Sequence, residues 1–242
     1  MTQYYRGETL QAWAGVGSSK TTLALVFTDI VGSTALGNKL GDDKWIELLM
    51  RHFRRARDLT EQFDCYEIKV IGDSFMVAFR TAFEALQFAM EFYCDTGDPQ
   101  IRIRAGIHLG QVRIIDNDLY GRMVNYTSRV EHSIQGTGIA VSTSAKADIE
   151  AELGDESKTV FFRPFPTKFK ESENPIQLWR VMTREMRLAD AERKQLNNPP
   201  PTQPSNAPPL QRPSIRPREE TPKQTSENLP GFLIRPRNKE GR

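Results

Sequence analysis

The chain has 242 residues, of which 26% are charged and 38% hydrophobic, and its net charge is +2. These values suit one folded domain with extensions and exclude a strongly basic chain built for nucleic acid. No apolar run approaches the ~20 residues that a membrane span needs, so we expect neither a membrane nor a nucleic-acid partner. Cys65 and Cys94 have no metal-type spacing, and no signal peptide is visible. We therefore expect a cytoplasmic protein with reduced thiols.

Composition divides the chain into three segments. Residues 1–19 form a polar N-terminal arm without a clear period. Residues 20–186 alternate strand-like and helix-like patterns and are expected to form the folded domain. Residues 187–242 contain 11 of the 15 prolines and more basic than acidic side chains. Because such a segment buries too little apolar surface to offset its ordering entropy, we predict a disordered, basic, Pro-rich tail.

Within the middle segment, a buried strand is expected over Leu23–Phe27, ending at Asp29. Asp42 is expected to cap a helix whose apolar face carries Ile46, Leu49, Met50, Phe53 and Ala56. The apolar runs Tyr66–Ile71 and Ser74–Phe79 flank a Gly-Asp pair and predict a hairpin.

A second amphipathic helix is predicted through Ala82, Ala85, Leu86, Ala89 and Phe92. Strict alternation then predicts a strand with one buried face through Ile101, Ile103, Ala105, Ile107 and Leu109. The order strand, helix, hairpin, helix, strand predicts an α+β fold of the ferredoxin-like βαββαβ type, with further elements after it.

Two aspartates occupy informative places in this plan. Asp29 ends the first strand and Asp73 lies at the hairpin tip, and these two places are neighbours in a βαββαβ sheet. Two carboxylates there would suit Mg²⁺ or Mn²⁺ carrying triphosphate oxygens. Taken alone, each aspartate is better explained as a capping or turn residue. The small-residue turn Gly32-Ser33-Thr34 leads toward a helix, whose backbone N–H groups could bind phosphate.

Three segments, in order along the chain, resemble the motifs of class III adenylate and guanylate cyclases. They are Phe27–Thr34, Lys69–Met76, and the stretch Asp118–Gly121 with Val124-Asn125 and Ser128-Arg129. The resemblance covers about residues 21–182 and implies a cyclase catalytic domain. A catalytic domain of this kind closes a nucleoside triphosphate into its 3′,5′-cyclic monophosphate and releases pyrophosphate.

The resemblance also implies residue roles. Asp29 and Asp73, with the backbone carbonyl of Ile30, are expected to hold two divalent metal ions, Mn²⁺ or Mg²⁺. Lys69 and Asp118 are expected to recognise the nucleobase of the substrate.

The other implied roles lie later in the chain. Asn125 is expected to orient the ribose and Arg129 to stabilise charge on the transferring phosphoryl group. A lysine near the last strand usually grips the terminal phosphates; Lys168 is the candidate, with Lys170 as its alternative. In the family the two halves of each site come from different subunits, which implies a homodimer with two composite sites.

The identity of the substrate's nucleobase is the feature that the sequence constrains least. Lys69 with Asp118 resembles the pair of adenylate cyclases, but one donor and one acceptor suit adenine, cytosine and uracil alike. The segments Val70–Arg80 and Arg104–His108 resemble the pyrimidine cyclases of Pycsar antiphage systems. That resemblance implies UTP, then CTP, as substrate, and a cyclic pyrimidine nucleotide read by a separate effector in antiviral defence. ATP is the alternative substrate, and a non-catalytic nucleotide-binding domain is the alternative of another class.

Overall fold

The computed structural model describes residues 7–15, 20–154, 159–170 and 173–197. Among the described helices, none is both long and apolar enough to cross a bilayer. In chain order the elements are α1 (Leu10–Trp13), β1 (Lys20–Ile30), α2 (Ser33–Leu40), α3 (Asp42–Gln62), β2 (Tyr66–Ile71), β3 (Ser74–Phe79), α4 (Ala82–Cys94), β4 (Ile103–Ile115), β5 (Asp118–Tyr120), α5 (Arg122–His132), β6 (Gly138–Ser142), α6 (Thr143–Leu153), β7 (Val160–Thr167), β8 (Ile176–Thr183) and α7 (Arg184–Asn197).

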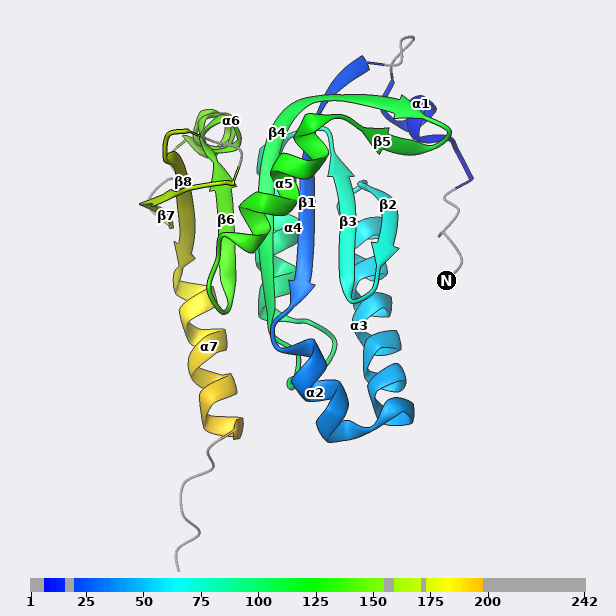
Figure 1. Cartoon of the computed structure of the whole chain (residues 1–242), viewed down its shortest axis with the longest axis vertical. Coiled ribbons are helices and arrows are strands. Elements are labelled where there is room, and N and C mark those ends of the chain that lie inside the picture. The colour runs from blue at the N-terminus through cyan, green and yellow to red at the C-terminus, as the bar shows by residue number, and fades with distance from the viewer. Residues whose placement is uncertain (1–6, 16–19, 155–158, 171–172, 198–242) are drawn as a thin grey trace, which may run out of the picture. The chain divides into compact units, whose positions relative to one another are not determined.

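The strands form one 8-stranded sheet in the order β2-β3-β1-β4-β6-β8-β7, with β5 paired to β4 (Figure 1). β1 lies between β3 and β4 and is antiparallel to both, while β4 pairs in parallel with β6. The run β1–α3–β2–β3–α4–β4, with the short α2 after β1, is therefore the predicted βαββαβ unit. The predicted α+β class and the predicted hairpin are confirmed, and β5 to β8 extend the sheet.

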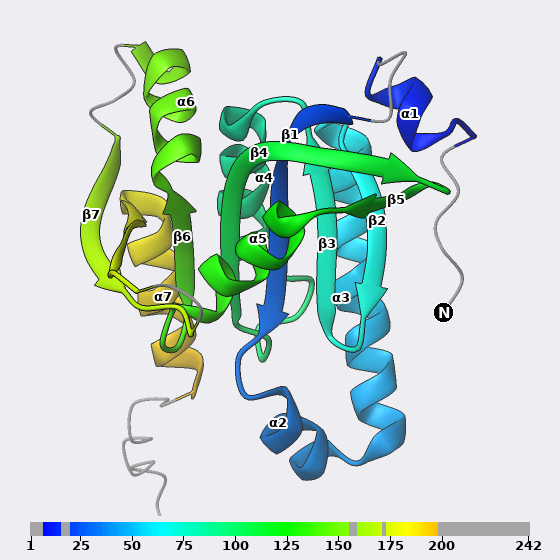
Figure 2. The same cartoon turned by 45° about the horizontal axis from the view of Figure 1, so that its top comes forward.

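The sheet has two differently covered faces. Because side chains alternate along a strand, β1 sends Ala24, Val26 and Ile30 into a core shared with α3 and α4. Leu23 and Phe27 of the same strand join a second cluster, on the opposite face. In Figures 1 and 2, α3 and α4 lie on one side of the sheet and α5 crosses the other. Asp29, two residues after Phe27, is on the α5 side.

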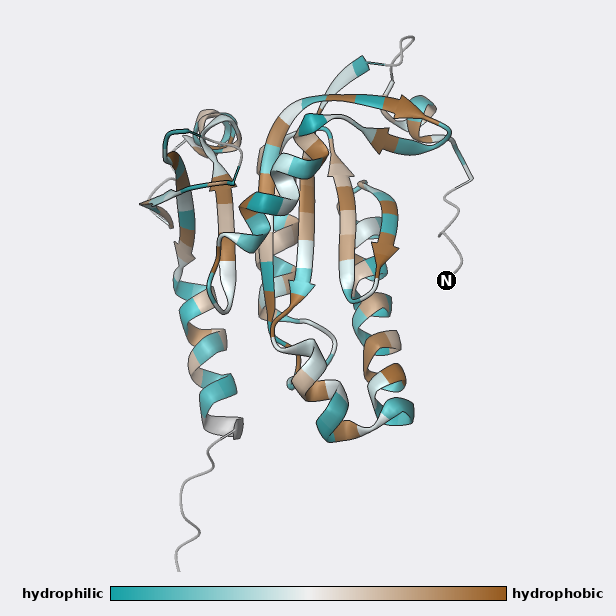
Figure 3. Cartoon of the chain, viewed as in Figure 1, coloured by the Kyte–Doolittle hydropathy of each residue, from teal (hydrophilic) through white to brown (hydrophobic). Residues whose placement is uncertain are grey.

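Helix α3 buries part of the expected face: Phe53 and Ala56 are buried and Leu49 is partly buried against the core, whereas Ile46 and Met50 are exposed. It mixes hydrophobic and hydrophilic residues along its length (Figure 3). Its cap is Gly41, and Asp42 is already helical. Ile46 and Met50 are 54% and 60% exposed, because at about 100° per residue they lie beyond the edge of the buried stripe that Phe53 marks. The buried residues are Leu48, His52, Phe53, Ala56, Leu59 and Thr60.

The predicted disordered tail begins too early. Residues 187–197 belong to α7, so the described domain extends past the expected boundary at residue 186. Arg193 of α7 is buried and donates hydrogen bonds to the carbonyl oxygens of Tyr93 (2.6 Å) and Cys94 (2.9 Å) at the C-terminus of α4. A cation at a helix C-terminus satisfies its last carbonyls, which ties α7 to α4. The rest of the predicted tail, residues 198–242, lies outside the described residues.

Part of the expected polar arm is packed into the domain. Leu10 and Trp13 of α1 are buried in the second cluster. The Trp13 indole donates to the Asp64 carbonyl (3.1 Å), and Arg80 lies over its ring at 4.7 Å. Because a four-residue helix is too short to show helical periodicity, no helix was expected here. Residues 1–6 and 16–19 of the arm lie outside the described residues.

Buried His52 makes folding sensitive to acid. Burial lowers its pKa to about 4, against the opposing effects of the Thr96 carbonyl, to which its Nδ1 donates (2.8 Å), and of Asp73. The unfolded chain therefore binds more protons than the folded chain between pH 6.5 and about 4, so stability falls as pH falls through this window. We expect the titration of His52 to lower the free energy of unfolding by about 2 kcal/mol at pH 5 relative to pH 7. Urea unfolding of His52→Gln at both pH values should show a correspondingly smaller loss, and an unchanged loss would contradict this assignment.

Candidate active site

The two predicted metal aspartates lie at the same end of the sheet. Asp29 is the penultimate residue of β1, and Asp73 lies in the turn between β2 and β3. Thr28 pairs with Phe75 across the β1–β3 ladder, which brings the hairpin tip beside the end of β1. Ser74, next to Asp73, donates to Asp29 Oδ1 at 3.0 Å. The expected proximity of the strand end and the hairpin tip is thus confirmed.

The chemistry of this end of the sheet fits a divalent cation. Asp73 Oδ2 is buried and accepts no hydrogen bond from the described residues, so a carboxylate oxygen there is left to a ligand. Asp29 is mostly buried and adds a second carboxylate. Within the described ranges, no group of three or more His, Cys, Asp or Glu side chains could hold a metal. A cation here would complete its shell with backbone and substrate oxygens, as Mg²⁺ does at phosphates.

Arg104 belongs to this site although the sequence did not single it out. It faces Asp29 directly across the β1–β4 ladder, and its Nη2 donates to Asp29 Oδ2 at 2.6 Å. Its Nε donates to Glu131 of α5. Burial alone would lower the pKa of Arg104, but the charges of Glu131 and Asp29 raise it, so the guanidinium is a fixed cation. A fixed guanidinium beside Asp29 is also suited to phosphate oxygens.

Helix α5 approaches the sheet closely because of Gly106. A Cβ at this position would lie 2.2 Å from the Glu131 backbone nitrogen and 2.6 Å from its Cα. Any side chain would push α5 off β4, and backbone atoms cannot rotate away as a flexible side chain can.

We therefore expect Gly106→Ala to lower the free energy of unfolding by about 3 kcal/mol, measured by urea denaturation. Gly37→Ala is the matched control: its Cβ would meet only the Trp45 ring at ordinary contact distances near 3.5 Å. Because alanine favours a helix over glycine, this control should gain up to about 1 kcal/mol. Equal stability of the two variants would contradict the close approach of α5.

The two predicted base-reading residues contact each other. Lys69 of β2 and Asp118 of β5 are separated by 49 positions in the sequence, and Lys69 Nζ lies 2.5 Å from Asp118 Oδ2. The backbone N–H of Leu119 donates to the other oxygen of Asp118 at 2.7 Å, which fixes the carboxylate. Both side chains are about one-third exposed. One donor and one acceptor are therefore side by side and accessible to a ligand's polar edge.

The turn Gly32-Ser33-Thr34 begins α2 as expected. Gly32 has φ of 74°, in the left-handed region that glycine adopts without strain, and it caps α2 with no side-chain hydrogen bond. Ser33 and Thr34 are the first helical residues. Their N–H groups therefore belong to the uncapped first turn, which is an anion-binding arrangement directly after the end of β1 that carries Asp29.

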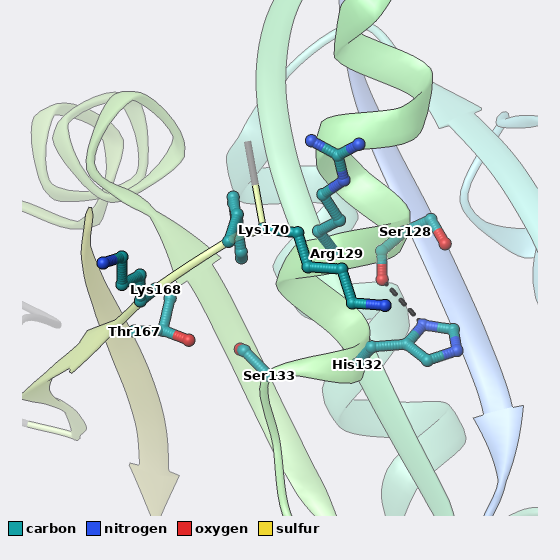
Figure 4. A pocket seen from close by; sticks show the side chains of 8 residues that line it. Ser128, Arg129, His132, Ser133, Thr167, Lys168 and Lys170 are labelled. Atoms are coloured by element: carbon teal, nitrogen blue, oxygen red, sulfur yellow. Dashed lines mark hydrogen bonds between the residues drawn. The ribbon is translucent and has the colours of Figure 1, made fainter. Parts of the chain in front are cut away.

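The predicted Asn125 and Arg129 are four residues apart on α5 and share one helix face. Asn125 is exposed. Arg129 borders a cavity of about 400 Å³ between α5 and the segment after β7, and its guanidinium lies 5.9 Å from the centre of the Phe169 ring. Lys168 and Lys170 line the same cavity (Figure 4). Figure 4 shows Lys170 extending toward His132 on α5, whereas Lys168 points away from α5.

These groups on this fold define a class of protein. Residues 17–160 match the family of adenylate and guanylate cyclase catalytic domains. The chain belongs to that family and is a nucleotide cyclase catalytic domain.

Curated relatives include receptor-type adenylate cyclases of trypanosomes. GRESAG 4.1 of Trypanosoma brucei brucei is 29% identical over 179 residues, which is 54% of this chain and 14% of the relative. ESAG 4 of the same organism is 26% identical over 207 residues, 66% of this chain and 16% of the relative. The chain thus spans about one-sixth or less of the length of these two proteins.

Solved structures support the same fold. An adenylate cyclase of Trypanosoma brucei in its monomeric state is 25% identical with a TM-score of 0.58, covering 67% of this chain and 88% of that one. The adenylyl cyclase CyaB from P. aeruginosa is 20% identical with a TM-score of 0.60, covering 69% of this chain and 96% of that one. At 20% identity, the similarity to CyaB concerns the fold alone.

Proposed function

We propose that this chain is a catalytically active nucleotide cyclase that forms a 3′,5′-cyclic monophosphate and pyrophosphate from a nucleoside triphosphate. The observation that carries the proposal is the buried, unpartnered Oδ2 of Asp73 beside Asp29. An unsatisfied buried carboxylate oxygen costs stability, and a cation-dependent reaction gives a reason to retain it. A domain that bound nucleotide without a cation would have no such need, and the product assay below distinguishes turnover from cation-dependent binding.

The residues that would hold two divalent ions are Asp29, Asp73 and the carbonyl of Ile30. When bound, such ions lower the pKa of the ribose 3′-hydroxyl and neutralise charge on the triphosphate. Arg104 and the N–H groups of α2 after Gly32 lie at the same end of β1 and would bind phosphate oxygens.

The remaining residues orient the substrate. Lys69 and Asp118 would separate to take the polar edge of the base between them. Asn125 would hold the ribose, and Arg129 would stabilise the charge that develops as the 3′-oxygen attacks the α-phosphorus. Because Lys170 extends toward α5, we favour it over Lys168 for the terminal phosphates.

We propose a homodimer in which α5 of one chain completes the metal half of the other. Asn125 is exposed on α5, as a residue that serves a second chain must be. The β4–β5 hairpin exposes Ile115 and Tyr120 to 45% and 50%, and a second copy could cover them.

For the substrate we propose a pyrimidine nucleotide, UTP before CTP, on the resemblance of residues 70–80 and 104–108 to pyrimidine cyclases of antiphage systems. The product would then be a second messenger for a separate effector in antiviral defence. The second candidate is ATP, which the names of the curated relatives favour. The Lys69–Asp118 pair suits either, since it offers one donor and one acceptor.

The test is to incubate the purified chain separately with ATP, GTP, CTP and UTP plus Mn²⁺ and to identify products by mass. We expect cyclic UMP, less cyclic CMP, and no cyclic product from an Asp73→Ala control. Cyclic AMP as the main product would retain the reaction and overturn the pyrimidine assignment. The absence of a cyclic product from all four triphosphates would overturn the proposed activity.

A further inference from the structure

Glu131 is a buried charged residue for which the proposed reaction has no direct use. It is 1% exposed, on the face of α5 that packs against the sheet. Arg104 Nε donates to its Oε1, and His132 Nδ1 lies 2.5 Å from its Oε2. Burying a carboxylate is costly unless its charge is paired, and the Arg104 guanidinium supplies that pairing, whereas His132 Nδ1 also donates to the Ser128 carbonyl.

The fold brings Glu131 to the metal-binding end of the sheet through three elements. Asp29 on β1 and Arg104 on β4 are register partners, so their side chains emerge on the same face. Gly106, two residues after Arg104, is on that face as well, and its lack of a side chain lets the backbone of Glu131 settle directly above β4. Glu131 thus contacts Arg104 from α5, which covers this face of the sheet, while Asp29 contacts it from the neighbouring strand β1.

We propose that Glu131 is a positioning residue that acts through Arg104 to keep Asp29 available to a divalent cation. The Arg104 guanidinium is shared between two carboxylates. Its Nε donates a hydrogen bond to Glu131, and its Nη2 donates one to Asp29. Without the charge of Glu131, Arg104 would pair with Asp29 alone and compete with the cation for it. The inference rests on the proposed function, because it requires that Asp29 bind metal.

The experiment measures Mn²⁺ binding without turnover, from the loss of the free Mn²⁺ signal in electron paramagnetic resonance, with a non-cyclisable triphosphate analogue present. We expect Glu131→Gln to weaken Mn²⁺ binding about tenfold, as loss of a group behind a metal ligand does. In turnover assays the half-activating Mn²⁺ concentration should rise by the same factor, with kcat at saturating Mn²⁺ within about twofold of wild type. Glu131→Asp, which keeps the charge on a shorter side chain, should give a smaller shift and serves if Glu131→Gln fails to fold.

Two comparisons separate positioning from a merely structural role. In an Arg104→Gln background, Glu131→Gln should change Mn²⁺ affinity by less than about twofold, because the guanidinium through which Glu131 acts on Asp29 is absent. Glu150→Gln removes a matched carboxylate, paired with Lys146 at 2.5 Å on α6, and should leave Mn²⁺ binding unchanged. A Glu131→Gln variant that loses thermal stability but binds Mn²⁺ like wild type would overturn the inference alone. A wild-type chain that binds no Mn²⁺ would overturn the proposed function with it.

Discussion

Replacing Arg129 with alanine should lower kcat by about 10²–10³-fold and change KM far less. Arg129 lies on the exposed side of α5, beside Lys168 and Lys170 at the cavity of about 400 Å³. In the proposed reaction its charge is most useful while negative charge develops on the transferring phosphoryl group, so its loss acts on the transition state more than on substrate binding.

Steady-state kinetics on the preferred triphosphate measures this effect. Arg122→Ala is the matched control, since Arg122 is an exposed arginine in the first turn of the same helix. It should retain kcat within about twofold, as expected for a substitution outside the site. Equal losses in the two variants would point to general damage to α5 and would contradict a specific role for Arg129.

Replacing Asp73 with asparagine should abolish turnover, by at least about 10³-fold, without destabilising the fold. Its Oδ2 is buried without a hydrogen-bond partner among the described residues, so the charge costs stability when no cation is bound. Asparagine has nearly the same shape and removes the part of that cost that comes from the charge. The melting temperature of Asp73→Asn should therefore equal or exceed that of wild type.

Mn²⁺ provides a second readout for the same variant. Because a ligand that binds only the folded state stabilises it, Mn²⁺ with a triphosphate analogue should raise the melting temperature of wild type but hardly that of Asp73→Asn. Asp43→Asn, in the exposed first turn of α3, should respond like wild type. An Asp73→Asn chain that still cyclises nucleotide would remove Asp73 from the metal site.

The sequence was sufficient for features that depend on local pattern and motif. Alternation at Ile103, Ala105 and Ile107 predicted β4, and the apolar runs around Gly72-Asp73 predicted the hairpin. From that plan followed the proximity of Asp29 to the hairpin tip.

Other features depend on packing between distant segments. Arg104 reads in the sequence as an ordinary outward-facing strand residue, and only the β1–β4 register puts it opposite Asp29, 75 positions away. The buried face of α3 was predicted only in part: Phe53 and Ala56 are buried as expected, but the packed face also takes in Leu48 and His52 and leaves Ile46 and Met50 exposed. Helix α7 was missed because the prolines after it dominated the composition, while the contact that holds it, Arg193 with Tyr93, spans 100 positions.

The central claim is that two chains of this protein together form a cyclase site. Asp73→Asn and Arg129→Ala chains carrying different affinity tags should be co-expressed and purified through both tags, then assayed for cyclic nucleotide by mass. Each variant alone has two defective sites, but the mixed dimer has one site with an intact metal half and an intact α5 half. We predict about half the activity of the wild-type dimer from this mixed dimer, since one of its two sites is whole. A doubly tagged dimer as inactive as either variant alone would contradict the claim.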